Sequence, residues 1–154
     1  DKLFASDVDV QVIWQTGRYY HEEALKHLKA YRGMPVWCSD FITRMDYAYA
    51  AADLIISRAG ASSISELCLL KKPVILVPSP NVAEDHQTKN ALALVDKEAA
   101  ILVADKDAEQ QLVPKALEVI HDDERLRLLS RNIATLAQHQ SAERIVDEIV
   151  KIIE

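Results

Sequence analysis

The chain has 154 residues, 49% of them hydrophobic and 27% charged, a composition that excludes a disordered tail, a collagen-like fibre and a coiled coil. The formal net charge is −6, which offers nucleic acid no overall positive field, so no nucleic-acid partner is expected. Only 3 glycines are present, against a usual share of about 7%, so each glycine is expected to meet a backbone requirement.

Strand-like apolar runs alternate with helical patterns from residue 8 to about residue 103. The predicted strands are residues 8–14, 35–38, 53–57, 73–77 and 100–103, and the predicted helices between them are 20–31, 45–52, 62–70 and 86–97. Three more helices are predicted over 110–120, 123–136 and 141–153. Short strands separated by helices indicate βαβ units. We therefore predict an α/β fold, with a Rossmann-like parallel sheet flanked by helices and a helical C-terminal tail.

Compartment and membrane signals are sparse. Cys38 and Cys68 lie in apolar surroundings and form no CxxC motif, so they are predicted to be small core residues in a reducing, cytoplasmic setting. No apolar run reaches the roughly 18 residues of a membrane span, and no signal-peptide pattern opens the chain. The residues Asp1–Phe4 contain no initiator methionine, so we expect the chain to begin inside a longer protein.

Ligands of open α/β sheets bind beyond the carboxyl ends of the strands. Four predicted strands are followed there by polar segments: Gln15–Gly17, Asp40–Met45, Arg58–Ser63 and Pro78–Gln87. These segments hold most of the polar chemistry that is not plain surface charge. They are therefore the candidate binding loops.

The segment around Gly60 carries the clearest binding pattern. Gly60 is expected to permit a tight turn and a close approach of ligand to backbone. The N–H groups of Ala61, Ser62 and Ser63 then lie at a helix N-terminus, which suits a phosphate. Glu66, one turn further on, is spaced to accept ribose hydroxyls. The alternative is a capping box formed by Ser63 and Glu66, with no ligand.

The segment that follows the predicted strand 73–77 leads into a polar helix start. His86, Gln87 and Asn90 carry an imidazole and two amides, which can bond to several sugar hydroxyls at once. The alternative is an ordinary helix N-cap at Asp85 with a solvated His86.

The remaining polar clusters are predicted to be structural. Residues 121–124 (HDDE) fall between two helices and are expected to form a solvated turn with an N-cap. Tyr47 is expected to pack on a helix face. No P-loop, dinucleotide-binding or nucleophile-elbow motif is present, and no metal site is predicted.

Four blocks, in order, resemble the MurG family of glycosyltransferases. They are Phe41-Ile42-x-x-Met45, residues 52–66 (ADLIISRAGASSISE), residues 73–78 (PVILVP) and Asp85-His86-Gln87-x-x-Asn90. Members transfer N-acetylglucosamine from UDP-N-acetylglucosamine to undecaprenyl-pyrophosphoryl-muramoyl-pentapeptide, converting lipid I to lipid II in peptidoglycan synthesis. The resemblance covers residues 1–154 and implies the C-terminal, nucleotide-sugar-binding half of a GT-B fold.

For the UDP moiety, the resemblance implies four sets of contacts. The Ile42 backbone meets the uracil edge, and Met45 packs nearby. After Gly60, residues Ala61, Ser62 and Ser63 hold the diphosphate, and Glu66 takes the ribose hydroxyls. Arg58 supports the phosphate turn.

For the sugar, the resemblance implies that His86, Gln87 and Asn90 line the N-acetylglucosamine. Some members carry two consecutive glutamines where this chain has His86-Gln87, which makes Gln87 the firmer sugar contact. Residues Gln15, Thr16 and Gly17 resemble the family's Q-[ST]-G loop near the interdomain cleft.

The rest of the family's machinery is expected outside this chain. The resemblance places a first strand with a glycine-rich loop before Asp1, and an N-terminal domain with the general base, the acceptor site and a membrane-facing patch. The chain alone is therefore expected to hold no catalytic residue and to be inactive. The reaction is expected to be inverting and metal-independent, on the cytoplasmic face of the bacterial inner membrane.

Three other functions fit the same residues. One is the donor-binding half of another UDP-sugar transferase with the GT-B fold. Another is a non-catalytic nucleotide-sugar-binding subunit or module that needs a partner chain. The third is a UDP-sugar epimerase, which shares the two-lobed fold.

Overall fold

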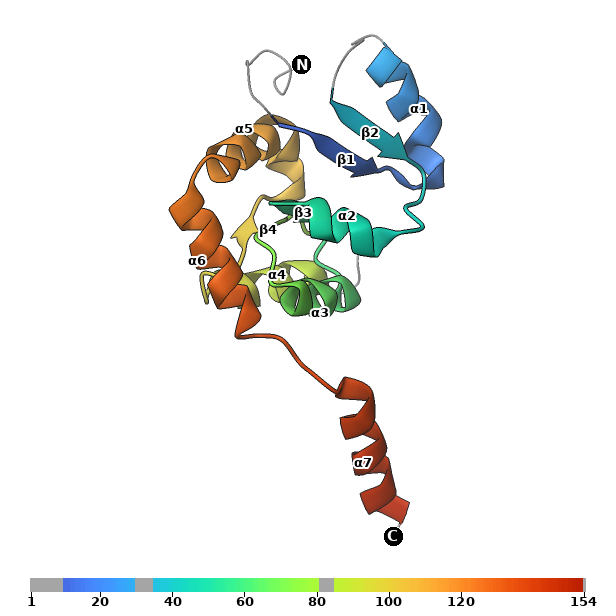
Figure 1. Cartoon of the computed structure of the whole chain (residues 1–154), viewed down its shortest axis with the longest axis vertical. Helices are drawn as coiled ribbons and strands as arrows, with labels where there is room; N and C mark the ends of the chain where they lie inside the picture. The colour runs from blue at the N-terminus through green and yellow to red at the C-terminus, as the bar shows by residue number, and fades with distance from the viewer. Residues whose placement is uncertain (1–9, 30–34, 81–84, 154) are drawn as a thin grey trace. The chain divides into compact units, whose positions relative to one another are not determined.

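The computed structural model describes residues 10–29, 35–80 and 85–153. The chain divides into two compact units, Asp1–Ala52 and Asp53–Glu154. The predicted alternation of strands and helices is confirmed in both (Figure 1). The five predicted strands are present, but they form two parallel sheets, of two and three strands, where a single sheet was predicted.

The first unit holds a parallel strand pair and two helices. Its elements are β1 (Val12–Gln15), α1 (Gly17–Lys29), β2 (Val36–Ser39) and α2 (Met45–Ala51). Val12 pairs with Val36 and Gln15 with Ser39, so the two strands end together at one edge. The first strand is predicted over residues 8–14; residues 8–9 lie outside the described residues, and the observed strand begins at Val12 and ends at Gln15.

The second unit holds the three-stranded sheet and most of the helices. Its elements are β3 (Ile55–Ser57), α3 (Ala61–Leu70), β4 (Val74–Leu76), α4 (His86–Val95), β5 (Ile101–Leu102), a 3-10 turn η2 (Asp105–Asp107), α5 (Ala108–Ile120), α6 (Asp123–Ala134) and α7 (Ser141–Ile153). The strand order is β3-β4-β5, all parallel, so α3 and α4 are the crossovers that parallel strands require. Helix α3 packs against α4 and α6, and α5 packs against α6.

The core of the second unit follows from the two-residue repeat of its central strand. Ile75 and Val77 turn to one face and are buried against Ala108, Leu112 and Ala116 of α5. Val74 and Leu76 turn to the opposite face and are also fully buried. A strand that is covered on both faces must be apolar at every position, which explains the continuous run PVILV.

The cysteines differ in their environment. Cys68 in α3 is 3% exposed, which confirms it as a core residue, whereas Cys38 in β2 is only half-buried. Burial raises the pKa of both thiols. Both side chains therefore remain thiols at neutral pH.

Helix α7 differs from the other described helices in being exposed along its whole length. Each of its residues is exposed, including Ile145, Ile149, Ile152 and Ile153. None of the described helices has the length and apolar character needed to cross a membrane.

Candidate functional site

Two loops of the second unit leave its sheet at the same edge. Ser57, the last residue of β3, pairs with Leu76, the last residue of β4. The segment that leads into α3 and the segment that leads toward α4 therefore start side by side. The structure therefore brings the starts of two candidate loops together; residues 81–84 of the second loop lie outside the described residues.

Helix α3 begins without a side-chain cap. Gly60 is its N-cap residue, and the first helical hydrogen bond runs from the Ile64 N–H to the Gly60 carbonyl at 2.9 Å. Within the described part of the chain, the N–H groups of Ala61, Ser62 and Ser63 meet no acceptor. The capping-box alternative is wrong, because Ser63 already lies inside the helix and cannot be its N-cap.

Gly60 does not need the conformational freedom of glycine. Its φ is −67°, which any residue adopts, so the expectation that each glycine meets a backbone requirement is wrong at this position. A Cβ atom at Gly60 would meet only the Ser63 Oγ, at 3.7 Å, an ordinary contact. The structure does not test the other expectation for this glycine, a close approach of ligand to the backbone.

The side chains beyond the α3 N-terminus face solvent. Ser62 and Glu66 are exposed and lie four positions apart, so they share a face of the helix. The predicted placement of a carboxylate one turn beyond the free N–H groups therefore agrees with the structure.

Gln87 and Asn90 of α4 bind the backbone that leads into α3. The Gln87 Oε1 accepts from the Ala59 N–H at 3.2 Å and from the Ser79 N–H at 2.9 Å. The Asn90 Nδ2 donates to the Ala59 carbonyl at 3.1 Å. Ala59 itself is 0% exposed. Both predicted sugar contacts therefore lie at the α3 turn, and each makes part of its hydrogen bonding to protein.

Arg58 braces the same edge of the sheet. Its guanidinium forms an ion pair with Asp105 and donates to the carbonyls of Val77, at 3.2 Å, and Pro78, at 3.4 Å. These contacts hold Arg58 to the end of β4 and to Asp105, and its implied support of the phosphate turn stays a prediction. Asp105 is not recognisable as this partner from the sequence, because the local sequence around η2 gives no sign of a contact 47 residues away.

The start of α4 is strained at one residue. Asp85 is the N-cap residue, as the alternative reading expected, but its side chain makes no capping bond. Its φ of 54° and ψ of 36° place it in the left-handed region, which Asp tolerates better than most residues. His86 is the first residue of the helix and is exposed.

The first unit carries the other predicted contacts. The Gln15 Oε1 accepts from the Ile42 N–H at 2.8 Å, and Ile42 is 9% exposed. The Thr16 N–H donates to the Ser39 carbonyl at 3.0 Å, and Gly17 has a φ of +71°. Met45, half-buried, opens α2. The Q-T-G loop thus holds the segment that contains Ile42.

An apolar hollow of about 500 Å³ lies within this unit. It is lined by Ile13, Trp37, Ser39, Phe41, Ile42, Thr43, Arg44, Tyr47 and Ala48. Tyr47 is 64% exposed, so its predicted role in packing on a helix face is wrong. The Arg44 guanidinium covers the Tyr47 ring, 3.7 Å from its centroid, and pairs with Asp46 at 2.7 Å. That pairing raises the pKa of Arg44 and lowers the pKa of Asp46.

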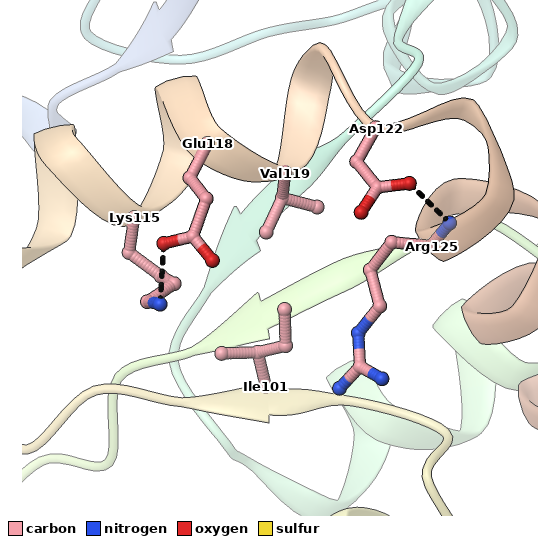
Figure 2. A pocket seen from close by; sticks show the side chains of 6 residues that line it. All are labelled: Ile101, Lys115, Glu118, Val119, Asp122 and Arg125. Atoms are coloured by element: carbon pink, nitrogen blue, oxygen red, sulfur yellow. Dashed lines mark hydrogen bonds and ion pairs between the residues drawn. The ribbon is translucent and has the colours of Figure 1, made fainter.

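A second hollow, of about 340 Å³, lies in the second unit between β5, α5 and α6 (Figure 2). Three of its charged side chains have partners in the protein: Lys115 pairs with Glu118 at 2.5 Å, and Asp122 accepts from the Arg125 backbone N–H at 2.9 Å. It lies at Ile101, the first residue of β5, and so at the amino end of that strand. Asp122 is the N-cap of α6, which confirms the predicted structural role of residues 121–124.

No metal centre is assembled by the described residues, since no three His, Cys, Asp or Glu side chains gather to hold an ion. The positive charge near the α3 turn comes from Arg58, which is already paired with Asp105. The backbone N–H groups at the start of α3 are therefore among the groups at this edge that remain available to an anion.

Comparison with known proteins supports the sequence resemblance. Residues 1–149 match the model of the glycosyltransferase family 28 C-terminal domain. The chain is 81% identical, over its whole length, to the UDP-N-acetylglucosamine--N-acetylmuramyl-(pentapeptide) pyrophosphoryl-undecaprenol N-acetylglucosamine transferase of Parabacteroides distasonis, and spans 41% of that protein. It is 59% identical to the protein of the same name from Bacteroides fragilis over 98% of this chain and 40% of that protein.

Among solved structures, the fold is similar to that of Acinetobacter baumannii MurG. The TM-score is 0.84 at 29% sequence identity, over 97% of this chain and 43% of that one. The chain thus spans less than half the length of the relatives that it matches. Its sequence and its α/β architecture agree on one assignment: the chain belongs to the glycosyltransferase family 28 C-terminal domain family.

Proposed function

We propose that residues 1–154 bind UDP-N-acetylglucosamine as the donor half of an inverting glycosyltransferase that converts lipid I to lipid II. The observation that carries the proposal is the N-terminus of α3, where the N–H groups of Ala61, Ser62 and Ser63 meet no acceptor within the described residues. The names of the Parabacteroides and Bacteroides relatives state an N-acetylglucosamine transfer, which favours this sugar over other UDP-sugars.

The diphosphate is the part of the donor that α3 suits best. Three backbone N–H groups and the positive end of the helix dipole attract negative charge without a basic side chain. The chain's net charge of −6 is no obstacle, because these donors do not enter the count of charged residues. Gly60 lets the phosphate approach the backbone.

For the uridine, we assign Glu66 to the ribose and Ile42 to the base. Glu66 is exposed one turn beyond Ser62, and a carboxylate accepts from both ribose hydroxyls. The Ile42 N–H is bonded to Gln15, so its carbonyl is the group offered to the N3–H of uracil. Met45 and the apolar hollow beside Ile42 supply contact area.

For the sugar, we assign His86 and the free halves of two amides. Because the Gln87 Oε1 and the Asn90 Nδ2 bond to protein, Gln87 offers its Nε2 as a donor and Asn90 its Oδ1 as an acceptor. A hydroxyl group donates and accepts at once, so this pair matches the chemistry of a sugar ring.

The contribution of this half to the reaction is a set of fixed N–H donors that stabilise the leaving group. The acceptor hydroxyl attacks the anomeric carbon, and the bond from that carbon to the β-phosphate oxygen breaks. The electron pair stays on UDP, where the α3 N–H groups stabilise the growing charge, and each such donor is worth about 3–4 kcal/mol. No metal ion is required. The general base, the lipid acceptor and the contact with the cytoplasmic membrane face belong to the rest of the protein.

Calorimetric titration of the complete protein with UDP-N-acetylglucosamine tests the proposal. The wild type is expected to bind equally well with and without EDTA. Glu66→Gln keeps the shape of the side chain but exchanges an acceptor oxygen for a donor, so it should weaken binding about tenfold or more.

The matched control is Glu109→Gln, which changes an exposed glutamate in the first turn of α5. It should leave the affinity unchanged. An unaltered affinity in Glu66→Gln would rule out the ribose role, and loss of binding in EDTA would reveal a metal site.

A further inference from the structure

The short segment before α3 is held by another helix through side chains. Ala59 is fully buried, so its N–H and carbonyl both need partners away from water. Gln87 accepts from its N–H at 3.2 Å, and Asn90 donates to its carbonyl at 3.1 Å. Both side chains come from α4, whereas Ala59 lies between β3 and α3. One residue is therefore fixed on both sides by one distant helix.

Gln87 also ties the two ligand-facing loops to each other. Its Oε1 accepts a second hydrogen bond, at 2.9 Å, from the N–H of Ser79, which follows β4. A single amide oxygen thus joins the loop after β3 to the loop after β4. The bonding leaves no freedom to rotate the amide by a half-turn, because the nitrogen would then face two N–H donors.

The direction of the α3 donors depends on this arrangement. Gly60 receives no side-chain cap, so capping does not set the angle at which the chain enters the helix. Ala59, the residue directly before Gly60, is held in place by Gln87 and Asn90. The N–H groups of Ala61, Ser62 and Ser63 follow within one turn.

We propose that Gln87 and Asn90 are positioning residues for the phosphate-binding turn, because they hold both peptide groups of Ala59 and so aim the α3 N–H groups at a diphosphate. This rests on the proposed donor-binding function. It assigns the two side chains a task that concerns UDP itself, in addition to any contact with the sugar.

Binding of UDP without a sugar separates the two tasks. In the complete protein, Gln87→Ala and Asn90→Ala are each expected to weaken UDP binding about tenfold, since a buried peptide group loses its partner and the turn shifts. If the two residues serve only the sugar, both variants will lose affinity for UDP-N-acetylglucosamine and keep wild-type affinity for UDP, which would overturn the proposal.

Leu92→Ala is the matched control for general loosening of α4. The hydrogen bonds from Gln87 and Asn90 to Ala59 and Ser79 are called the clamp below. Leu92 lies on the same helix, is 44% exposed and takes no part in the clamp. It should bind UDP like the wild type. An equal loss in Leu92→Ala would show that any disturbance of α4 weakens binding, and the specific role of Gln87 and Asn90 would be refuted.

Amide hydrogen exchange without ligand tests the clamp independently of UDP binding. Gln87→Ala should speed exchange at the Ala59 and Ser79 N–H groups about tenfold or more, whereas Gln87→Glu keeps an accepting oxygen and should restore protection. Unchanged exchange in Gln87→Ala would disprove the clamp. If the wild type fails to bind UDP, the proposed function falls, and the exchange data still decide whether the clamp exists.

Discussion

The absence of a side chain matters at Gly17 and at Gly60 for different reasons. Gly17 has a φ of +71°, a backbone conformation that other residues adopt at a cost, whereas Gly60 has a φ of −67°. A Cβ atom would meet nothing within 4 Å at Gly17 and only the Ser63 Oγ at Gly60. Backbone conformation therefore explains the first glycine, whereas the second is explained only by the ligand approach that we propose.

Alanine substitutions should separate these two roles. Gly17→Ala is expected to lower the free energy of unfolding by about 1 kcal/mol, because alanine resists the left-handed conformation. Gly60→Ala should leave that free energy within about 0.5 kcal/mol of wild type but weaken UDP binding about tenfold, since the methyl group meets the phosphate. Urea denaturation and calorimetry measure the two quantities.

Either of two results would contradict this explanation of the glycines. Wild-type UDP affinity in Gly60→Ala would show that no ligand approaches the backbone at that point. A large loss of stability in the same variant would show that its backbone angles conceal a tight steric requirement.

Sequence reasoning at single residues succeeded where the signal was local. The spacing of Glu66 from Ser62 and Ser63 is a property of any helix, so its place one turn beyond the N-terminus could be predicted. The partners of Ala59 and Arg58 could not, because Gln87, Asn90 and Asp105 reach them only after the sheet has formed.

The elements were predictable where apolar runs were long or periodic. The run PVILV identified β4, and the predicted helix over 141–153 coincides with α7. The start of α3 was harder to place, because Gly60, Ser62 and Ser63 are all acceptable N-caps by residue type. The position at which the helix begins depends on the path of the chain from β3 through Ala59, and that path is set by tertiary contacts with α4.

Two N-caps offer a test at the scale of the element. Asp122 caps α6 through a 2.9 Å bond from the Arg125 N–H, whereas Asp107 is the N-cap residue of α5 and makes no such bond. Asp122→Ala is expected to lower the free energy of unfolding by about 1 kcal/mol, and Asp107→Ala by clearly less. Equal losses in urea denaturation would mean that the capping bond contributes nothing.

At the scale of the molecule, the proposed function assigns this chain only part of a transfer reaction. It spans 41% of the Parabacteroides relative, and the groups proposed for it bind the donor and stabilise the leaving group. Nothing assigned to it removes a proton from the acceptor hydroxyl. Binding and transfer should therefore separate when the chain is studied alone.

The 154-residue chain is expected to transfer no N-acetylglucosamine to a lipid-linked acceptor. The complete protein should transfer the sugar under the same conditions. A radiolabelled donor and extraction of the lipid product measure this directly. Transfer by the chain alone would place a general base within these residues and overturn the division of labour proposed above.

The order of the strands has a consequence for how the molecule is made. In both described sheets, every strand pairs with the strand before it in the chain: β2 with β1, β4 with β3 and β5 with β4. On a ribosome, each new strand therefore meets a partner that has already emerged, and no strand needs to wait for a distant segment. The turn at Ala59 does wait for a later segment, because Gln87 and Asn90 can support it only after α4 has been synthesised.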